Sequence, residues 1–296
     1  MPTAEFMLGV PRFNEVGMTE LCKLCCKNPL GPKSHIIPSF VIKWLKETSA
    51  TGRIRQGINP NVRMQDGLKP PMFCSDCEGI ISKLEKTFSE KIFIPYLSGG
   101  KTDFEYEEWL SRYLVSQSLR CALFWLEDFS KDRPDLSAKV LAAINHWKSC
   151  LLSDQVDRTH HHHLIFSNFT EATEHFSEFV YWYLERTTDT VLLDGKNEVL
   201  AFTVYPKMII ISFVYPRGTD SGFVNTQVFE KGQLAVRNQE ISYPGIANTI
   251  KESAQFIEQS IKTVSERQQR KVDSDTQANP SWFDSETFNT RKKMKR

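Results

Sequence analysis

The chain has 296 residues, of which 40% are hydrophobic and 11% aromatic, enough apolar surface for one large or two modest folded domains. Its 37 Lys and Arg residues balance 36 Asp and Glu residues, and this net charge of +1 excludes a protein whose overall field attracts polyanions. No run approaches the ~20 apolar residues that cross a bilayer, and the first residues lack the layout of a secretion signal. We therefore expect a soluble, cytoplasmic protein with no membrane partner.

Two cysteine pairs of the form CxxC stand near the N-terminus, Cys22 with Cys25 and Cys74 with Cys77. With seven cysteines in total and nothing that indicates export, metal ligation is a better interpretation than disulfide bonding. Each CxxC places two thiolates on one tight turn, so the two pairs supply the four ligands of a tetrahedral zinc ion. We predict that one structural Zn²⁺ staples residues 1–97 into a module, with Cys26 as an alternative ligand.

Within this module a short strand is expected at residues 34–38, which read Ser-His-Ile-Ile-Pro. The second CxxC opens a predicted helix, whose apolar face repeats at Ile81, Leu84 and Phe88.

The chain beyond a Gly-containing boundary at 97–101 is predicted to form a second, α+β domain over residues 102–271.

Helical periodicity covers residues 104–129 and 136–152. Strands are expected at 163–169, 179–193 and 199–214, the last turning at Tyr205-Pro206-Lys207, with Asp194-Gly195-Lys196-Asn197 as a second turn. The economical topology is a small antiparallel meander, with a weak strand at 226–236 and a closing helix from 246 to about 270. Residues 272–296 are polar and end in a basic cluster, so we expect a disordered tail.

The order of motifs in residues 22–88 resembles the zinc-ribbon members of the HNH (ββα-metal) endonucleases. The shared features are a CxxC pair, a strand that carries His-Ile-x-Pro, and a second CxxC that opens a helix. The resemblance implies an N-terminal zinc-stapled ββα fold, so the fold class expected for the whole chain is α+β.

The resemblance also implies site residues. His35 corresponds to the general base that activates water, and Glu78 to the helix residue that joins the catalytic metal site. Glu85 lies two helical turns further on and is a second candidate carboxylate. Carboxylate oxygens are suitable ligands for Mg²⁺ or Mn²⁺, the catalytic ion that this interpretation requires.

The sequence departs from the family pattern at two positions. Ser34 stands where the family has an Asp or His ligand. The family's central Asn, which orients the base, has no counterpart just before the second CxxC; the nearest asparagines are Asn59 and Asn61, and Gln65 and Asp66 lie closer.

Basic residues follow the predicted strand and form a candidate nucleic-acid surface. They are Lys43, Lys46, Arg53, Arg55 and Arg63. A solvated basic face without a ligand is the alternative interpretation.

A run of four histidines, 160–163, precedes a predicted strand. Consecutive residues of a strand point to opposite faces, so we favour a polar lead-in to the strand over a metal site.

We predict a metal-dependent, HNH-type endonuclease, a hydrolase that cleaves phosphodiester bonds in nucleic acid, with DNA favoured over RNA. A setting in bacterial or phage-related defence rests on analogy alone. Two alternatives stay open: a catalytically inactive zinc module that binds nucleic acid, and a zinc-stapled protein-interaction module. In each case the C-terminal domain is free to bind a protein partner or ligand.

Overall fold

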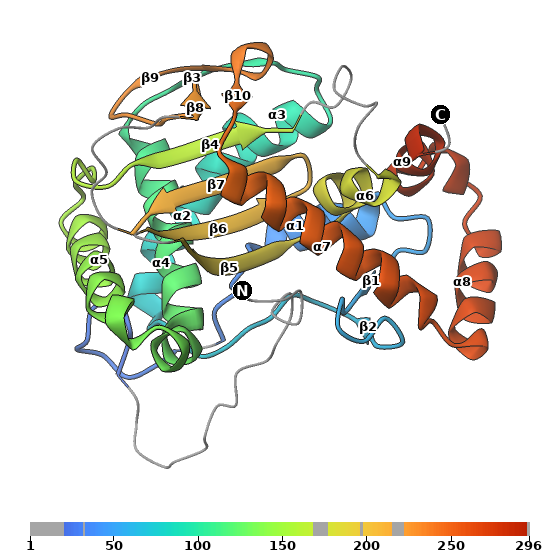
Figure 1. Ribbon diagram of the computed structural model, residues 1–296, viewed down its shortest axis with the longest axis horizontal. Coiled ribbons are helices and arrows are strands. Elements are labelled where there is room, and N and C mark those ends of the chain that lie inside the picture. The colour runs from blue at the N-terminus through green and yellow to red at the C-terminus, as the bar shows by residue number, and fades with distance from the viewer. Residues whose placement is uncertain (1–20, 32, 168–176, 196–197, 215–221, 295–296) are drawn as a thin grey trace.

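A computed structural model describes residues 21–31, 33–167, 177–195, 198–214 and 222–294. Helices and strands mix in one arrangement, with a four-stranded sheet at its centre and helices on both faces (Figure 1). Within these residues, none of the helices is long and apolar enough to cross a membrane.

The central sheet is antiparallel, with strand order β4-β7-β6-β5. Its strands are β4 (His162–Phe166), β5 (Asp189–Asp194), β6 (Val199–Tyr205) and β7 (Met208–Phe213). The expected antiparallel meander is therefore present in β5, β6 and β7. The tight turn between β6 and β7 places Lys207 in the left-handed region, at φ 60°. Lys196 and Asn197 of the other expected turn lie outside the described residues.

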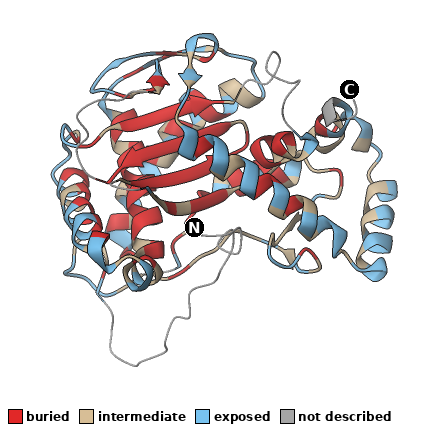
Figure 2. Ribbon diagram, in the orientation of Figure 1, coloured by how far each residue is buried: buried red, intermediate tan, exposed pale blue. Residues whose placement is uncertain are grey.

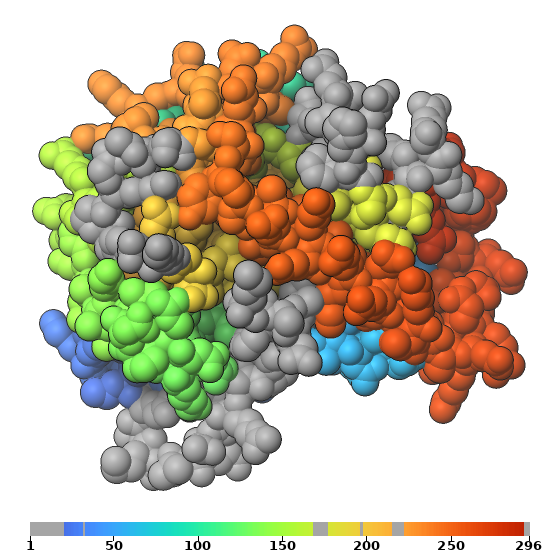
Figure 3. All heavy atoms as spheres, viewed as in Figure 1, coloured from blue at the N-terminus to red at the C-terminus, as the bar shows by residue number. Residues whose placement is uncertain are grey.

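Both faces of this sheet are buried, which explains why its strands read as continuous apolar runs (Figure 2). Along β7, Ile209, Ile211 and Phe213 pack with helices α6 (Glu178–Arg186) and α7 (Pro244–Lys262). The alternate residues Met208 and Ile210 belong to the core on the other face. In the space-filling view α7 crosses the front of the molecule as a continuous band (Figure 3).

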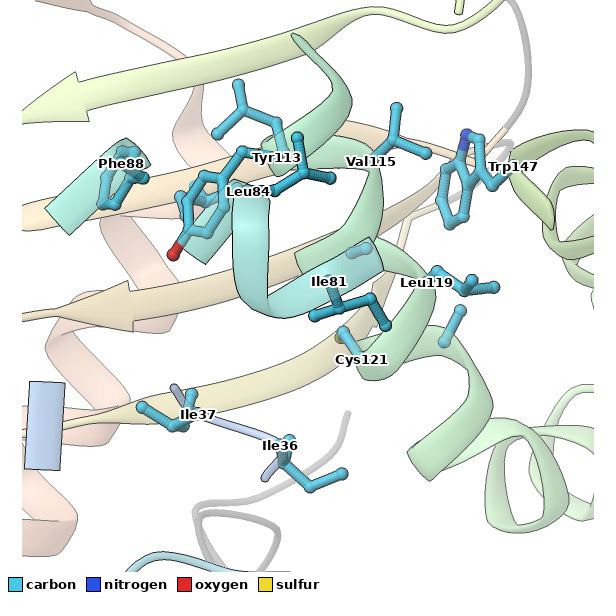
Figure 4. Close-up of a cluster of buried hydrophobic side chains, with 14 of the residues drawn as sticks. Ile36, Ile37, Ile81, Leu84, Phe88, Tyr113, Val115, Leu119, Cys121 and Trp147 are labelled. Carbon is cyan, nitrogen blue, oxygen red and sulfur yellow. The ribbon is translucent and has the colours of Figure 1, made fainter. Parts of the chain in front are cut away.

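The core on the opposite face joins the cysteine-rich N-terminal region to the long helices. It contains residues of α2 (Ser75–Phe88), α4 (Glu108–Asp132), α5 (Pro134–Leu152) and the sheet. Figure 4 shows Leu84 of α2 near Tyr113 of α4, in the same cluster as Ile81, Ile36 and Ile37. Phe88 stacks on Tyr113 at a centroid distance of 4.0 Å. Helices α4 and α5 correspond to the two helices predicted from periodicity, but residues 104–106 of the first prediction lie in strand β3 (Asp103–Tyr106) instead.

Residues 179–186, expected within a strand, lie in helix α6 instead. Their aromatic and β-branched composition favours a strand, but Val180, Tyr183 and Leu184 have helical spacing and bury one face against the sheet. Burial of that face decides the structure, and only the later part of the expected strand becomes β5.

In the N-terminal region the expected HNH-like ββα fold is not confirmed, although two short strands precede helix α2. Two strands of two residues each, β1 (Ile54–Arg55) and β2 (Arg63–Met64), form a hairpin after helix α1 (Ser39–Glu47). Residues 34–36 are extended rather than part of a strand: the backbone N–H groups of Ser34 and Ile36 donate to the carbonyls of Pro70 and Leu68. After α2 the chain continues through a π-helical turn (Ser89–Phe93) into α3 (Ile94–Leu97).

Two small sheets complete the fold beyond β4. They pair β3 (Asp103–Tyr106) with β9 (Gly232–Ala235), and β8 (Phe223–Val224) with β10 (Glu240–Ile241), which follows a short 3₁₀ turn (Val236–Asn238).

The expected disordered tail is ordered through residue 294, as helix α8 (Glu266–Ala278), a 3₁₀ turn (Trp282–Asp284) and helix α9 (Glu286–Met294). Specific contacts hold it, since the Thr290 hydroxyl donates to Glu185 at 2.8 Å and Lys207 pairs with Glu286 at 3.1 Å. Composition alone did not reveal these partners.

Candidate functional site: a four-cysteine centre beside His35

The four predicted cysteines come together in one cluster. The sulfur atoms of Cys22, Cys25, Cys74 and Cys77 all lie within 4.8 Å of one another. Sγ of Cys25 is 3.8 Å from Sγ of Cys74, far longer than a disulfide. Zinc held tetrahedrally at ~2.3 Å from each sulfur requires a sulfur separation of about 3.8 Å. The cluster therefore fits a four-thiolate metal ion such as zinc.

Tight backbone turns position these sulfurs. The N–H of Cys26 donates to the carbonyl of Cys22 at 2.8 Å, and Cys26 itself takes the left-handed conformation at φ 55°. The backbone N–H of Asn28 lowers the pKa of the Cys25 thiol to about 6. Burial raises the pKa of Cys77, so metal coordination would be what makes that sulfur a thiolate. Lys23 N–H donates to the Met72 carbonyl and joins the two turns.

His35 lies against Asp66, one of the residues that the sequence left open as its partner. Nε2 of His35 is 3.1 Å from Oδ1 of Asp66, and the two side chains are 23% and 40% exposed. Asp66 also pairs with Lys69 and accepts the Gly67 N–H at 2.8 Å. Burial would raise the pKa of the Asp66 carboxyl, but the hydrogen bonds of Lys69, Gly67 and His35 together hold it below its usual value. A carboxylate therefore stays in contact with the imidazole at neutral pH.

The backbone around His35 is held by α4. Nη1 of Arg120 donates to the His35 carbonyl at 3.1 Å, and the side chain of Gln117 donates to the Ile36 carbonyl at 3.2 Å. Arg120 is only 2% exposed, so this contact belongs to the interior. The segment that carries His35 is thus fixed between the cysteine centre and the main helix of the molecule.

The two candidate carboxylates on α2 have different surroundings. Oε1 of Glu85 accepts from Nη1 of Arg120 at 2.5 Å, so a buried guanidinium neutralises it. Oε1 of Glu78 is buried and has no hydrogen-bond partner among the described residues. Neither Glu78 nor Glu85 makes a hydrogen bond or ion pair with the His35 side chain within that part of the chain. The His35 side chain therefore has Asp66 as its hydrogen-bond partner, and a role for the α2 carboxylates beside it stays a prediction.

Ser34, the departure from the family pattern, is 2% exposed. Its hydroxyl accepts the Phe73 N–H at 3.3 Å and so joins the two segments that lead into α2. Ser34 occupies a structural position here.

Most basic side chains of the candidate nucleic-acid surface already form ion pairs or hydrogen bonds within the protein. Asp275 of α8 lies 2.9 Å from Arg63 and 3.8 Å from Arg53. Arg55 donates to the Pro60 carbonyl at 2.5 Å, and Lys46 donates to the Gln65 carbonyl at 3.0 Å. Lys43, paired with Glu47 at 3.7 Å, is 74% exposed and is the most open cation of the five.

Asp157 is a buried polar residue that the sequence did not single out. Oδ2 of this carboxylate lies 2.8 Å from Nδ1 of His160 and 3.1 Å from Nε2 of His162. Alternate residues of the histidine run thus share one partner, while Nδ1 of His163 contacts Thr226 at 2.9 Å. The sequence offered one signal for this cluster, because Asp157 precedes His160 by three residues and His162 by five.

Comparison of the chain with protein families, with curated proteins and with solved structures found no match in any of the three.

Proposed function

We propose that the protein hydrolyses phosphodiester bonds in nucleic acid, with His35 as the general base. The observation that carries this proposal is the contact between the partly exposed His35 ring and the ionised Asp66 carboxylate. Because Nε2 is taken up by Asp66, Nδ1 is the nitrogen that accepts a proton; it makes no hydrogen bond within the described part of the chain.

Asp66 takes the role of the missing central asparagine. Its carboxylate fixes the orientation and tautomer of the His35 ring and stabilises the imidazolium that forms when the ring takes a proton from water. Arg120 and Gln117 hold the backbone of the same segment, so the base has a defined position. The cysteine centre anchors both ends of the loop that carries His35 and Asp66.

A divalent ion such as Mg²⁺ or Mn²⁺ would supply charge neutralisation on the phosphate. The residues present fit it poorly, since Lys69 already pairs with Asp66 and Arg120 with Glu85. The buried Oε1 of Glu78 has no hydrogen-bond partner among the described residues. The proposal therefore rests on His35 and Asp66 and assigns no step to the metal.

The test is cleavage of plasmid DNA and of RNA, each with Mg²⁺, with Mn²⁺ and with EDTA, by wild type, His35→Ala and Asp66→Asn. General-base catalysis predicts a loss of ~10²- to 10⁴-fold for His35→Ala. Loss of the orienting partner predicts a smaller loss of ~10- to 100-fold for Asp66→Asn. Equal cleavage by wild type and His35→Ala contradicts the proposal.

A second candidate function is an inactive zinc module that binds nucleic acid or another protein. Two sets of ion pairs favour this candidate, Glu85 with Arg120, and Arg53 and Arg63 with Asp275. In a working nuclease these charged side chains would instead contact the metal ion or the substrate. Salt-sensitive binding without cleavage supports the nucleic-acid form of this candidate, and the absence of both supports the protein-interaction form.

A further inference from the structure

A second set of metal-ligating side chains lies at the C-terminal end of α5, apart from the four-cysteine centre. His146 and Cys150 are four residues apart on this helix, so they share one face. Asp157 follows in the connection to β4 and points back to them. Nε2 of His146, Sγ of Cys150 and a carboxylate oxygen of Asp157 all lie within 4.8 Å of one another.

The distances between these atoms are close to those around a tetrahedral zinc ion. Nε2 of His146 is 3.5 Å from Sγ of Cys150, where Zn–S of ~2.3 Å and Zn–N of ~2.0 Å require about 3.6 Å. Nε2 is 3.0 Å from Oδ1 of Asp157, against about 3.3 Å around such an ion. These ligand atoms would need to move apart by only a few tenths of an ångström to accommodate the ion.

Hydrogen bonds from neighbouring groups orient the Asp157 carboxylate. Oδ1 accepts the N–H of Thr159 at 2.7 Å and of His160 at 3.1 Å, while the rings of His160 and His162 contact Oδ2. The carboxylate is 0% exposed. Such hydrogen bonds to a ligating carboxylate are typical of built metal sites.

A hydrolytic Asp–His–Ser triad is the other chemistry that this cluster suggests, because Nδ1 of His162 lies 2.6 Å from the Ser212 hydroxyl. Ser212 is 0% exposed, and its hydroxyl also contacts that of Ser118 at 2.6 Å. No substrate can reach a nucleophile enclosed between β7 and α4. His146, by contrast, is 39% exposed and gives an ion a path from solvent.

We propose that His146, Cys150 and Asp157 bind a second zinc ion. One imidazole, one thiolate and one carboxylate form a donor set that suits Zn²⁺ and disfavours Mg²⁺ and Ca²⁺, which prefer oxygen ligands. Three protein ligands leave the fourth position of the ion to water or an added ligand, as in zinc sites with an open position.

The test is the metal content of the full-length chain after loading with ZnCl₂ and removal of unbound metal. The wild type is expected to retain two zinc ions per chain, and His146→Ala and Cys150→Ala one each. Cys121→Ala is the matched control, because Cys121 is a buried thiol of α4 outside both clusters, and it should retain two.

Circular dichroism of each variant separates loss of the ion from loss of the fold. His146→Ala is the safer variant for this purpose, because His146 is more exposed than Cys150. A Co²⁺-loaded wild type should show thiolate-to-cobalt absorption beyond that of folded His146→Ala. One zinc per wild-type chain, or two zinc ions retained by both His146→Ala and Cys150→Ala, overturns the proposal.

Discussion

At the scale of single residues, the interior of this protein contains charged groups that only the folded structure explains. Arg120 is the clearest case, because a buried guanidinium in α4 contacts both Glu85 of α2 and the backbone of His35. The sequence predicted that Glu85 lies near the helix face of Glu78, but it could not show that Arg120 of a distant helix pairs with Glu85.

Arg120→Met should lower the free energy of unfolding by about 3 to 5 kcal/mol, because it leaves the Glu85 carboxylate buried without its partner. The double variant Glu85→Leu with Arg120→Met should recover part of that loss, since both charges are then removed. Urea unfolding of the two single variants and the double variant measures the coupling. Additive losses would show that the pair is not a unit.

Asp189, at the start of β5, should make stability depend on pH. Burial raises the pKa of its carboxyl to about 6, although Tyr183 donates to it at 2.9 Å. The folded state therefore holds a proton that the unfolded chain releases near pH 4, and this stabilisation is lost as pH rises from about 4 to 6. It amounts to about 3 kcal/mol.

The measurement compares wild type and Asp189→Asn by urea unfolding at several pH values between 4 and 7. Relative to the variant, the wild type should lose stability as pH rises, and the difference should level off above pH 6. A difference that is constant with pH would contradict the assignment.

At the scale of elements, a continuous apolar run with a turn inside it predicted the β6–β7 hairpin. Sequence periodicity predicted α4 and α5, because their apolar residues have helical spacing. It missed α6, whose aromatic residues favour a strand when judged one by one. It also missed the pairing of His146 with Cys150, although four-residue spacing on a predicted helix was visible in the sequence. Asp66 as the partner of His35 required a loop conformation that no periodicity encodes.

Helix α8 covers the basic loop through Asp275, which pairs with Arg53 and Arg63. Asp275→Asn should release both arginines and strengthen binding to nucleic acid. The slope of the logarithm of the binding constant against the logarithm of salt concentration should then steepen by about one for each additional phosphate that the arginines neutralise. Fluorescence anisotropy at several salt concentrations measures this slope. Asp273→Asn, on the same helix but paired with Gln269, is the control and should leave it unchanged. Identical slopes for both variants would argue against a nucleic-acid surface here.

At the scale of the whole molecule, one hydrophobic core extends from Cys22 to Val236. The sequence predicts separate modules because composition changes near residue 97, and this division stays a prediction. We expect chelation of the four-cysteine metal, or Cys74→Ser, to destabilise α4 together with the N-terminal region. Cys26→Ser, which alters an exposed thiol outside the metal cluster, should leave stability unchanged.

Hydrogen exchange of the α4 amides, with and without chelator, measures this coupling. Faster exchange in α4 after chelation is the expected result, because Gln117 and Arg120 lose the ordered segment that they contact. Exchange that changes only before residue 97 would show two independent units.

The most direct test of the proposed function is single-turnover cleavage of an end-labelled nucleic acid by wild type, His35→Ala and His161→Ala, each with its zinc content measured. His161→Ala removes an imidazole elsewhere in the molecule and should cleave at the wild-type rate. We predict that His35→Ala is slower by about 100-fold or more. Equal rates for all three proteins would contradict His35 as the general base.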